Sequence, residues 1–192
     1  MEMNARLRRL ESDYKSLKLE FSRHPFIDVE PIAGDPPEKY LVTFKVKGYK
    51  MDEKSGKPTL ANRHQVEVYL HANYPREKPK CQMKTPIFHP NFRYQVCIGD
   101  FWGAGERLVD IIIQIGDMIQ YKNYNPKSPL NIEASRWAKE NVHRFPADNV
   151  DLWQPEPEVN VGDSQKDNFD ILLTPSKRKI NSEKSDVDIK LF

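Results

Sequence analysis

Two stretches of alternating apolar and polar residues constrain the fold of this 192-residue chain more than any other feature. Between Tyr40 and Lys47 every second residue is large and apolar, and the same period of two recurs between Gln65 and His71. A turn at Asp52–Pro58 separates them, and a third short strand is expected at Lys80–Met83. Consecutive strands with short connections predict an antiparallel meander and not alternating βαβ units.

Three helices are expected around this sheet. An apolar stripe near the N-terminus, spaced by three and four residues, predicts an amphipathic helix that ends at His24-Pro25. The apolar run Leu108–Ile119 predicts a mostly buried second helix, and a third is expected over about Asn131–Arg144, where Asn131 and Glu133 suit a helix start. Strands followed by helices predict an α+β fold. The N-terminal stripe consists of Leu7, Leu10, Tyr14, Leu17 and Phe21.

The stretch Asn73–Gly105 breaks both patterns. It holds four prolines, three glycines and both cysteines of the chain, Cys81 and Cys97. A long irregular segment inside a domain is usually functional. Two cysteines cannot build a disulfide framework, and no signal peptide or membrane-spanning run is recognised, so a cytoplasmic protein with free thiols is expected. The histidines are scattered and no Cys-x-x-Cys pair occurs, so no metal site is expected.

Cys97 has the surroundings of a nucleophile. Polar and aromatic residues flank it, and Gly99 and Gly103 follow closely, which leaves room for another chain to approach the backbone. A lone cysteine is more often a small buried hydrophobic residue. This description fits Cys81, which lies on the same face of the predicted strand as Met83. Cys97 is therefore the candidate nucleophile, and Cys81 is expected in the core.

The composition changes after Phe145. Residues 146–192 hold ten acidic and six basic residues, a net charge of −4 in a chain of net +2, so residues 1–145 carry +6. We expect a folded domain over residues 1–145 and an acidic, proline-punctuated extension over 146–192. Two apolar patches in the extension, Ile171–Leu173 and Val187–Leu191, each suit pairing with a sheet edge. The mildly basic body suits an acidic protein partner, and the bias is too weak to indicate nucleic acid.

Five stretches follow one another in an informative order. Tyr74–Pro79 reads YPREKP, Thr85–Asn91 reads TPIFHPN, Val96–Ile98 reads VCI, then come Trp102 and Asn125–Asn131, which reads NPKSPLN. Together they resemble the core of ubiquitin-conjugating enzymes over roughly residues 5–145. The resemblance implies an N-terminal helix, a four-stranded antiparallel β-meander, an active-site segment, a crossover helix and a C-terminal helix.

The resemblance also implies roles for single residues. Cys97 would receive a ubiquitin-like protein as a thioester from an activating enzyme and pass it to a lysine amine. Asn91 matches an asparagine that stabilises the oxyanion or braces the adjacent loop, and both roles stay open. Ser128 matches the gate position that orients or deprotonates the lysine, although a serine is a poor base and a helix-entry role before Pro129 is equally open. Positions that match the family's structural motif are His89, Pro90, Tyr74, Pro75 and Trp102.

Partners follow from the same resemblance: a ubiquitin-like protein, an activating enzyme and a ligase. The basic residues expected to contact protein partners are Arg6, Arg8 and Arg9 on the first helix, which otherwise form a solvated face, and Arg76. Neither a membrane nor a nucleic acid is expected as a partner. No cofactor is implied, because the chain has no glycine-rich phosphate loop and ATP use belongs to the activating enzyme.

Some features depart from typical eukaryotic members. The gaps from Asn91 to Cys97 and from Cys97 to Trp102 are shorter, Arg76 replaces a hydrophobic ligase contact, and Gly103–Gly105 replaces Ser-Pro-Ala. These features resemble the conjugating enzymes of bacterial ubiquitin-like operons, some of which act in anti-phage defence.

Two other functions fit parts of the pattern. A cysteine hydrolase would combine Cys97 with a histidine and an asparagine, which His89 and Asn91 supply, and would place a histidine nitrogen at hydrogen-bond distance from the sulfur. A non-catalytic binding module of the same fold would function without Cys97.

Overall fold

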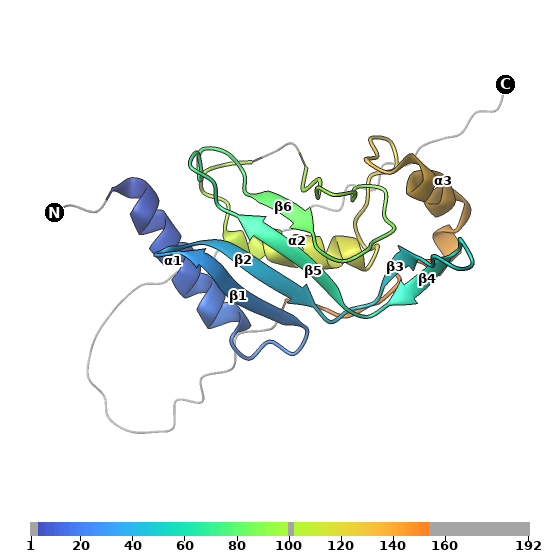
Figure 1. Ribbon diagram of the computed structural model, residues 1–192, viewed down its shortest axis with the longest axis horizontal. Helices are drawn as coiled ribbons and strands as arrows, with labels where there is room; N and C mark the ends of the chain where they lie inside the picture. Colours follow the sequence, from blue (N-terminus) through green and yellow to red (C-terminus); the bar gives the residue numbers. More distant parts are fainter. Residues whose placement is uncertain (1–3, 100–101, 154–192) are drawn as a thin grey trace, which may run out of the picture. The chain divides into compact units, whose positions relative to one another are not determined.

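The computed structural model describes residues 4–99 and 102–153. The extension patches Ile171–Leu173 and Val187–Leu191 lie outside the described residues. The elements run α1 (Ala5–Phe21), β1 (Ile27–Gly34), β2 (Pro37–Phe44), β3 (Gly48–Met51), β4 (Pro58–Ala61), β5 (His64–Tyr69), β6 (Lys80–Met83), α2 (Leu108–Ile119), α3 (Ile132–Glu140) and a 3₁₀ turn η1 (Val142–Arg144), as Figure 1 shows.

The predicted α+β fold with a four-stranded antiparallel meander is confirmed. The strands are ordered β1-β2-β5-β6, and each pairs antiparallel with its neighbour. The hairpin β3–β4 is inserted between β2 and β5, and its turn is the predicted Asp52–Pro58, closed by a bond from Gly56 N to Asp52 O. The prediction that the strand beginning at Tyr40 continues to Lys47 was wrong, because the chain leaves the sheet after Phe44 to enter this hairpin.

Strand β1 was not located from the sequence. It forms the edge of the sheet and pairs only with β2, from Ile27 opposite Phe44 to Gly34 opposite Pro37. Only Ile27 of this strand is fully buried, while Glu30 to Gly34 are exposed. Apolar alternation, the signal that identified β2 and β5, is short in this strand: Ile27 and Val29 alternate with Asp28 and Glu30, and the pattern ends at Pro31.

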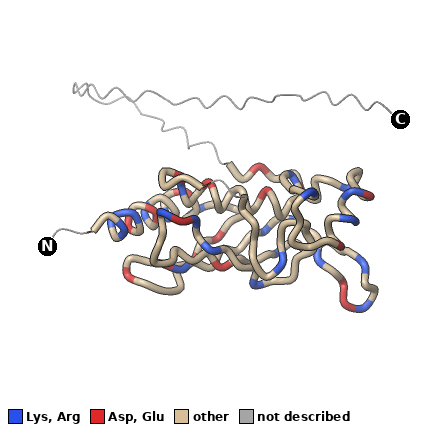
Figure 2. Tube along the Cα trace, turned by 90° about the horizontal axis from the view of Figure 1, so that it is seen from above, with Lys and Arg blue, Asp and Glu red and all other residues tan. Residues whose placement is uncertain are grey.

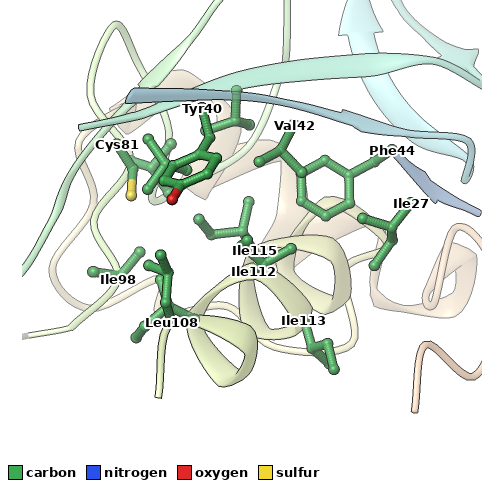
Figure 3. Packing of buried hydrophobic residues seen from close by; sticks show 14 of the residues in the cluster. Ile27, Tyr40, Val42, Phe44, Cys81, Ile98, Leu108, Ile112, Ile113 and Ile115 are labelled. Carbon is green, nitrogen blue, oxygen red and sulfur yellow. The ribbon is translucent and has the colours of Figure 1, made fainter. Parts of the chain in front are cut away.

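The main core lies between the sheet and α2. Figure 3 shows Val42 and Phe44 of β2 on one side and Ile112 and Ile115 of α2 on the other. Apolar residues occur on nearly every face of α2, as expected for a helix that is mostly buried. Cys81 of β6 is in this core, as predicted, and burial raises the pKa of its thiol to about 12, so it stays protonated and unreactive at neutral pH.

A second, aromatic core supports α3. Tyr121 stacks on Phe145 with ring centroids 4.3 Å apart, and Tyr49 contacts Trp137 edge to face. The predicted start of this helix is confirmed, because the Asn131 side chain accepts from Ala134 N. The predicted end at Arg144 was wrong: α3 ends at Glu140, and η1 continues to Arg144.

Residues 147–152 pack against the folded body, beyond the boundary expected at residue 145. Ala147 N donates to Gln120 O, and the Leu152 carbonyl lies 3.2 Å from His24 Nε2. Leu152 is buried against Gly116 of α2, where an added Cβ would come within 2.3 Å of the leucine Cδ1. This short segment therefore seals the end of the main core.

We predict that Leu152→Ala destabilises the protein by about 2–5 kcal/mol, the usual cost of removing a fully buried leucine side chain. Urea unfolding followed by tryptophan fluorescence measures the change. Val142→Ala, at a residue that is 57% exposed, is the matched control and should change the unfolding free energy by less than about 0.5 kcal/mol. Equal effects of the two substitutions would contradict the sealing role.

Candidate active site

Cys97 lies on the segment between β6 and α2, and its neighbours hold it in place. Val96 and Ile98 are buried in the main core, whereas Cys97 itself is only half-buried. Val96 N donates to Cys81 O at 3.0 Å, and Cys97 N donates to Asn91 O at 3.0 Å. The backbone is thus fixed on both sides of a thiol that remains accessible.

Cys97 opens onto a groove of about 210 Å³. The groove brings together all three catalytic candidates from the sequence, Cys97, Asn91 and Ser128. Its walls come from the segment after His89, from the buried helix α2 and from the loop before α3. The lining residues are Asn91, Cys97, Gly99, Gln114, Met118, Asn123, Tyr124, Asn125 and Ser128.

The Asn91 side chain binds the loop on the opposite wall. Its Oδ1 accepts from Asn125 N at 2.7 Å, and its Nδ2 donates to Asn125 O at 3.0 Å and to Ser128 O at 3.4 Å. Asn91 is only 4% exposed. In this geometry both ends of the amide are used to brace residues 125–128.

His89 and Pro90 continue the same junction. The Pro90 carbonyl accepts from Leu130 N at 2.8 Å and Asn131 N at 2.9 Å, which holds the start of α3. The His89 Nδ1 accepts from Asn91 N at 3.1 Å, so the ring fixes the turn that carries Asn91. Burial lowers the pKa of His89 to about 3, so the ring is neutral at physiological pH.

The geometry expected of a cysteine hydrolase is absent from the described residues. No histidine nitrogen among them makes a hydrogen bond to the Cys97 sulfur. The His89 ring is instead enclosed by Phe92 and Tyr121, with centroids 4.4 Å and 4.5 Å away. His89 therefore lacks the position of a general base for Cys97.

Ser128 lies at the open rim of the groove and is exposed. Its carbonyl is held by Asn91, and the turn just before it is held by the Ser135 hydroxyl, which donates to Pro126 O at 2.9 Å. At this position Ser128 can contact a group that enters the groove. Its hydroxyl can form hydrogen bonds but does not act as a base at neutral pH.

Tyr74, Pro75 and Trp102 form a support on the other side of the active-site segment. Trp102 Nε1 donates to Pro75 O at 2.8 Å, and the Tyr74 hydroxyl donates to Asp13 of α1 at 2.6 Å. Burial, reinforced by the Asp13 carboxylate, raises the pKa of Tyr74, so the phenol stays a donor. Arg9 completes the network.

The Arg9 guanidinium joins four groups from three parts of the chain. It donates to Asp13 at 2.8 Å, to the Tyr74 hydroxyl at 3.0 Å and to the carbonyls of Ala104 and Glu106. The segment that follows Cys97 is thereby tied to α1. The charge pattern of the first helix does not reveal this role, although Asp13, which lies between the stripe residues Leu10 and Tyr14, indicates that a buried partner exists.

The other arginines expected to bind partners differ in their surroundings. Arg6 pairs with Glu38 at 2.9 Å and donates to Leu70 O, whereas Arg8 and Arg76 are exposed. Figure 2 shows basic and acidic residues interleaved along the described trace. Partner binding by these residues remains a prediction.

Four groove residues were not singled out from the sequence: Gln114, Asn123, Tyr124 and Asn125. Asn125 belongs to the Asn-Pro stretch that carried the family resemblance, which was the one available signal. The other three enter the groove through the tertiary packing of α2 and its following turn, for which no local pattern exists.

None of the helices in the described ranges has the length and hydropathy needed to cross a bilayer. The same ranges bring no group of three or more histidine, cysteine, aspartate or glutamate side chains into an arrangement that would hold a metal.

The buried His89 predicts a specific loss of stability in acid. Its folded-state pKa lies below its ordinary value of 6.5, so the unfolded chain binds the proton first as the pH falls. Stability from this group is complete above pH 6.5 and declines by about 2 kcal/mol by pH 5. Urea unfolding of the protein and of His89→Gln across this range measures the difference. The variant should start less stable and decline less steeply, and parallel declines would contradict the assignment.

The Arg9 network predicts that Arg9→Ala lowers the free energy of unfolding by about 2–3 kcal/mol, since charged hydrogen bonds are lost and Asp13 stays buried. Lys15→Ala, on the same helix and exposed, is the matched control and should cost less than about 0.5 kcal/mol. Thermal and urea unfolding measure both. An Arg9→Ala protein as stable as the control would show that the network is dispensable.

Comparison with known proteins agrees with this geometry. A family model described as ubiquitin-conjugating enzyme matches residues 44–152 of the 192. The chain is 24% identical over 146 residues to ubiquitin-conjugating enzyme E2 S-C of Xenopus laevis, covering 71% of this chain and 68% of that protein. It is 24% identical over 151 residues to ubiquitin-conjugating enzyme E2 S of Homo sapiens, covering 72% of this chain and 66% of that protein.

Solved structures show the same fold. A putative ubiquitin conjugating enzyme from Trypanosoma cruzi aligns with a TM-score of 0.53 at 20% identity, covering 76% of this chain and 96% of that one. A structure described as a novel ubiquitin-conjugating enzyme aligns with the same TM-score and identity, covering 73% of this chain and 89% of the other. The family model spans more than half of the chain, and the chain therefore belongs to the ubiquitin-conjugating enzyme family.

Proposed function

We propose that this protein carries a ubiquitin-like protein as a thioester on Cys97 and transfers it to a lysine amine of a target protein. The observation that carries the proposal is the half-buried Cys97 in a groove whose opposite wall is braced by Asn91. Family membership supports an activating enzyme as the donor. The names of its relatives, ubiquitin-conjugating enzymes, support ubiquitin or a related protein as the cargo.

Loading exchanges one thioester for another. The Cys97 thiolate attacks the carbonyl carbon of the ubiquitin-like C-terminus, and the thiolate of the activating enzyme leaves with the electron pair of the broken C–S bond. No net oxidation occurs and no metal takes part. The accessible position of Cys97 suits this exchange, whereas Cys81, with its raised pKa, does not.

Transfer forms an amide at the expense of the thioester. A neutral amine attacks the carbonyl carbon, the carbonyl electron pair moves to oxygen, and the resulting oxyanion collapses with release of the Cys97 thiolate. The extra proton on the nitrogen passes to water or buffer. Ser128, at the rim of the groove, is placed to hydrogen-bond the amine, and loss of the amine proton then depends on desolvation.

The short active-site segment supports a narrower placement. Five residues separate Asn91 from Cys97, and Gly103 and Gly105 follow Trp102. We propose that the protein is one of the conjugating enzymes of bacterial ubiquitin-like operons and that it acts in anti-phage defence. Neighbouring genes for an activating enzyme, a ubiquitin-like protein and a deubiquitinase-type metallopeptidase would support this placement, and their absence would contradict it.

A thioester assay tests the main proposal. The protein is mixed with an activating enzyme, ATP and the ubiquitin-like protein which that enzyme charges, and the products are separated with and without reducing agent. We expect a thiol-sensitive adduct that becomes a stable ester in Cys97→Ser and is lost in Cys97→Ala. Cys81→Ala is the matched control and should keep the adduct.

Two results would contradict the proposal. An adduct that persists in Cys97→Ala would place the chemistry on another residue. A Cys97→Ala protein that keeps its full biological function would favour a non-catalytic binding module.

A further inference from the structure

The asparagine and glutamine side chains that line the groove differ in whether their N–H groups are already hydrogen-bonded. Asn91 uses its oxygen on Asn125 N and its Nδ2 group on the carbonyls of Asn125 and Ser128. Gln114 of α2 donates through Nε2 to the Ile98 carbonyl at 3.1 Å. These two amides hold the walls of the groove together. For Asn91 to donate to a bound carbonyl, it would have to release the loop it braces.

Asn125 is also held by hydrogen bonds, but these bonds use its backbone and its side-chain oxygen and not its side-chain N–H donor. Its backbone N–H and carbonyl are both bonded to Asn91, at 2.7 Å and 3.0 Å. Its side-chain Oδ1 accepts from Lys127 N at 2.9 Å, which fixes the plane of the amide. Within the described residues, the Asn125 Nδ2 group has no hydrogen-bond acceptor, and Asn125 lines the groove together with Cys97.

Catalysis of acyl transfer favours a donor that is already oriented when the oxyanion forms, because no reorganisation is then needed. Asn125 meets this condition through three hydrogen bonds that fix its backbone and its side-chain oxygen. Asn123 and Asn125 are both exposed where they line the groove, but the side chain of Asn123 is not anchored by any of the hydrogen bonds found in the described residues. The two asparagines thus offer the same chemistry with different degrees of preorganisation.

We propose that the Asn125 Nδ2 group, and not that of Asn91, donates the hydrogen bond to the thioester oxygen on Cys97 as it becomes an oxyanion. Asn91 is then a positioning residue that acts through Asn125. This inference rests on the proposed function. As the amine attacks, the carbonyl electron pair moves to the oxygen that Asn125 faces. On collapse the C–S bond breaks, the Cys97 thiolate leaves, and the amine proton passes to water.

The test separates loading from transfer. The thioester is formed on wild type and variants with the activating enzyme, ATP and the ubiquitin-like protein of the charging assay, then isolated, and its discharge to free L-lysine is followed in a single turnover. Asn125→Ala removes the donor. Asn125→Asp keeps the oxygen that Lys127 N binds and removes the donor with almost no change of shape. Asn62→Ala, at an exposed asparagine between β4 and β5 and outside the groove, is the matched control.

We expect both Asn125 variants to reach the wild-type yield of thioester when loading is run to completion, and to discharge about 10²–10³-fold more slowly, the usual effect of removing one oxyanion donor. Asn62→Ala should discharge within about threefold of wild type. Asn91→Ala should also discharge slowly, and Asn91→Ala/Asn125→Ala should be no slower than Asn125→Ala, because a positioning residue has no further effect once its target is gone.

Other results would overturn the inference. Near-normal discharge by both Asn125 variants, with slow discharge by Asn91→Ala, would return the donor role to Asn91. Multiplying effects in the double variant would show that the two residues act independently. Loss of loading together with discharge would show that Asn125 only maintains the fold. If wild type itself forms no thioester, the proposed function fails before this inference is reached.

Discussion

The hydrogen bonds of the Asn91 side chain are the constraint on which the rest of the site depends. They join two segments that are 34 residues apart in the sequence, the turn after His89 and the loop that enters α3. Without them, the loop at residues 125–128, which forms one wall of the groove, would lose its side-chain attachment to the opposite wall. Breaking these hydrogen bonds would also cost free energy, because the buried amide and each backbone group that it binds would then need a new hydrogen-bond partner.

This junction is supported from several directions at once. The Pro90 carbonyl holds the start of α3, and the neutral His89 ring holds the turn that carries Asn91. Val96 and Ile98 anchor the cysteine segment in the core between the sheet and α2. On the far side, Arg9 ties the residues after Trp102 to α1 and to Tyr74. Cys97 thus lies on an irregular segment that is held by backbone hydrogen bonds and by two buried neighbours, as the proposed catalysis requires.

Much of this arrangement was predictable from local patterns. The alternation in β2 and β5, the apolar run of α2 and the cap at Asn131 each express a periodicity or a local hydrogen bond. The edge strand β1 was not located because it buries almost nothing. Cys97, Asn91 and Ser128 line one groove, and their catalytic roles stay predictions. The hydrogen bonds of Arg9 and the donor role that we propose for Asn125 could not be predicted from the sequence, because they depend on which backbone groups lie close together in the folded chain.

The central claim is that a carbonyl attached to Cys97 occupies the Asn91-braced groove. A stable mimic tests it most directly: the structure of a Cys97→Lys protein joined by an isopeptide bond to the C-terminus of the ubiquitin-like protein. The account predicts that the isopeptide carbonyl lies between residue 97 and Asn125, with the hydrogen bonds of Asn91 to the 125–128 loop unchanged. A carbonyl directed away from the groove, or an Asn91 amide that has left the loop to bind it, would contradict the account.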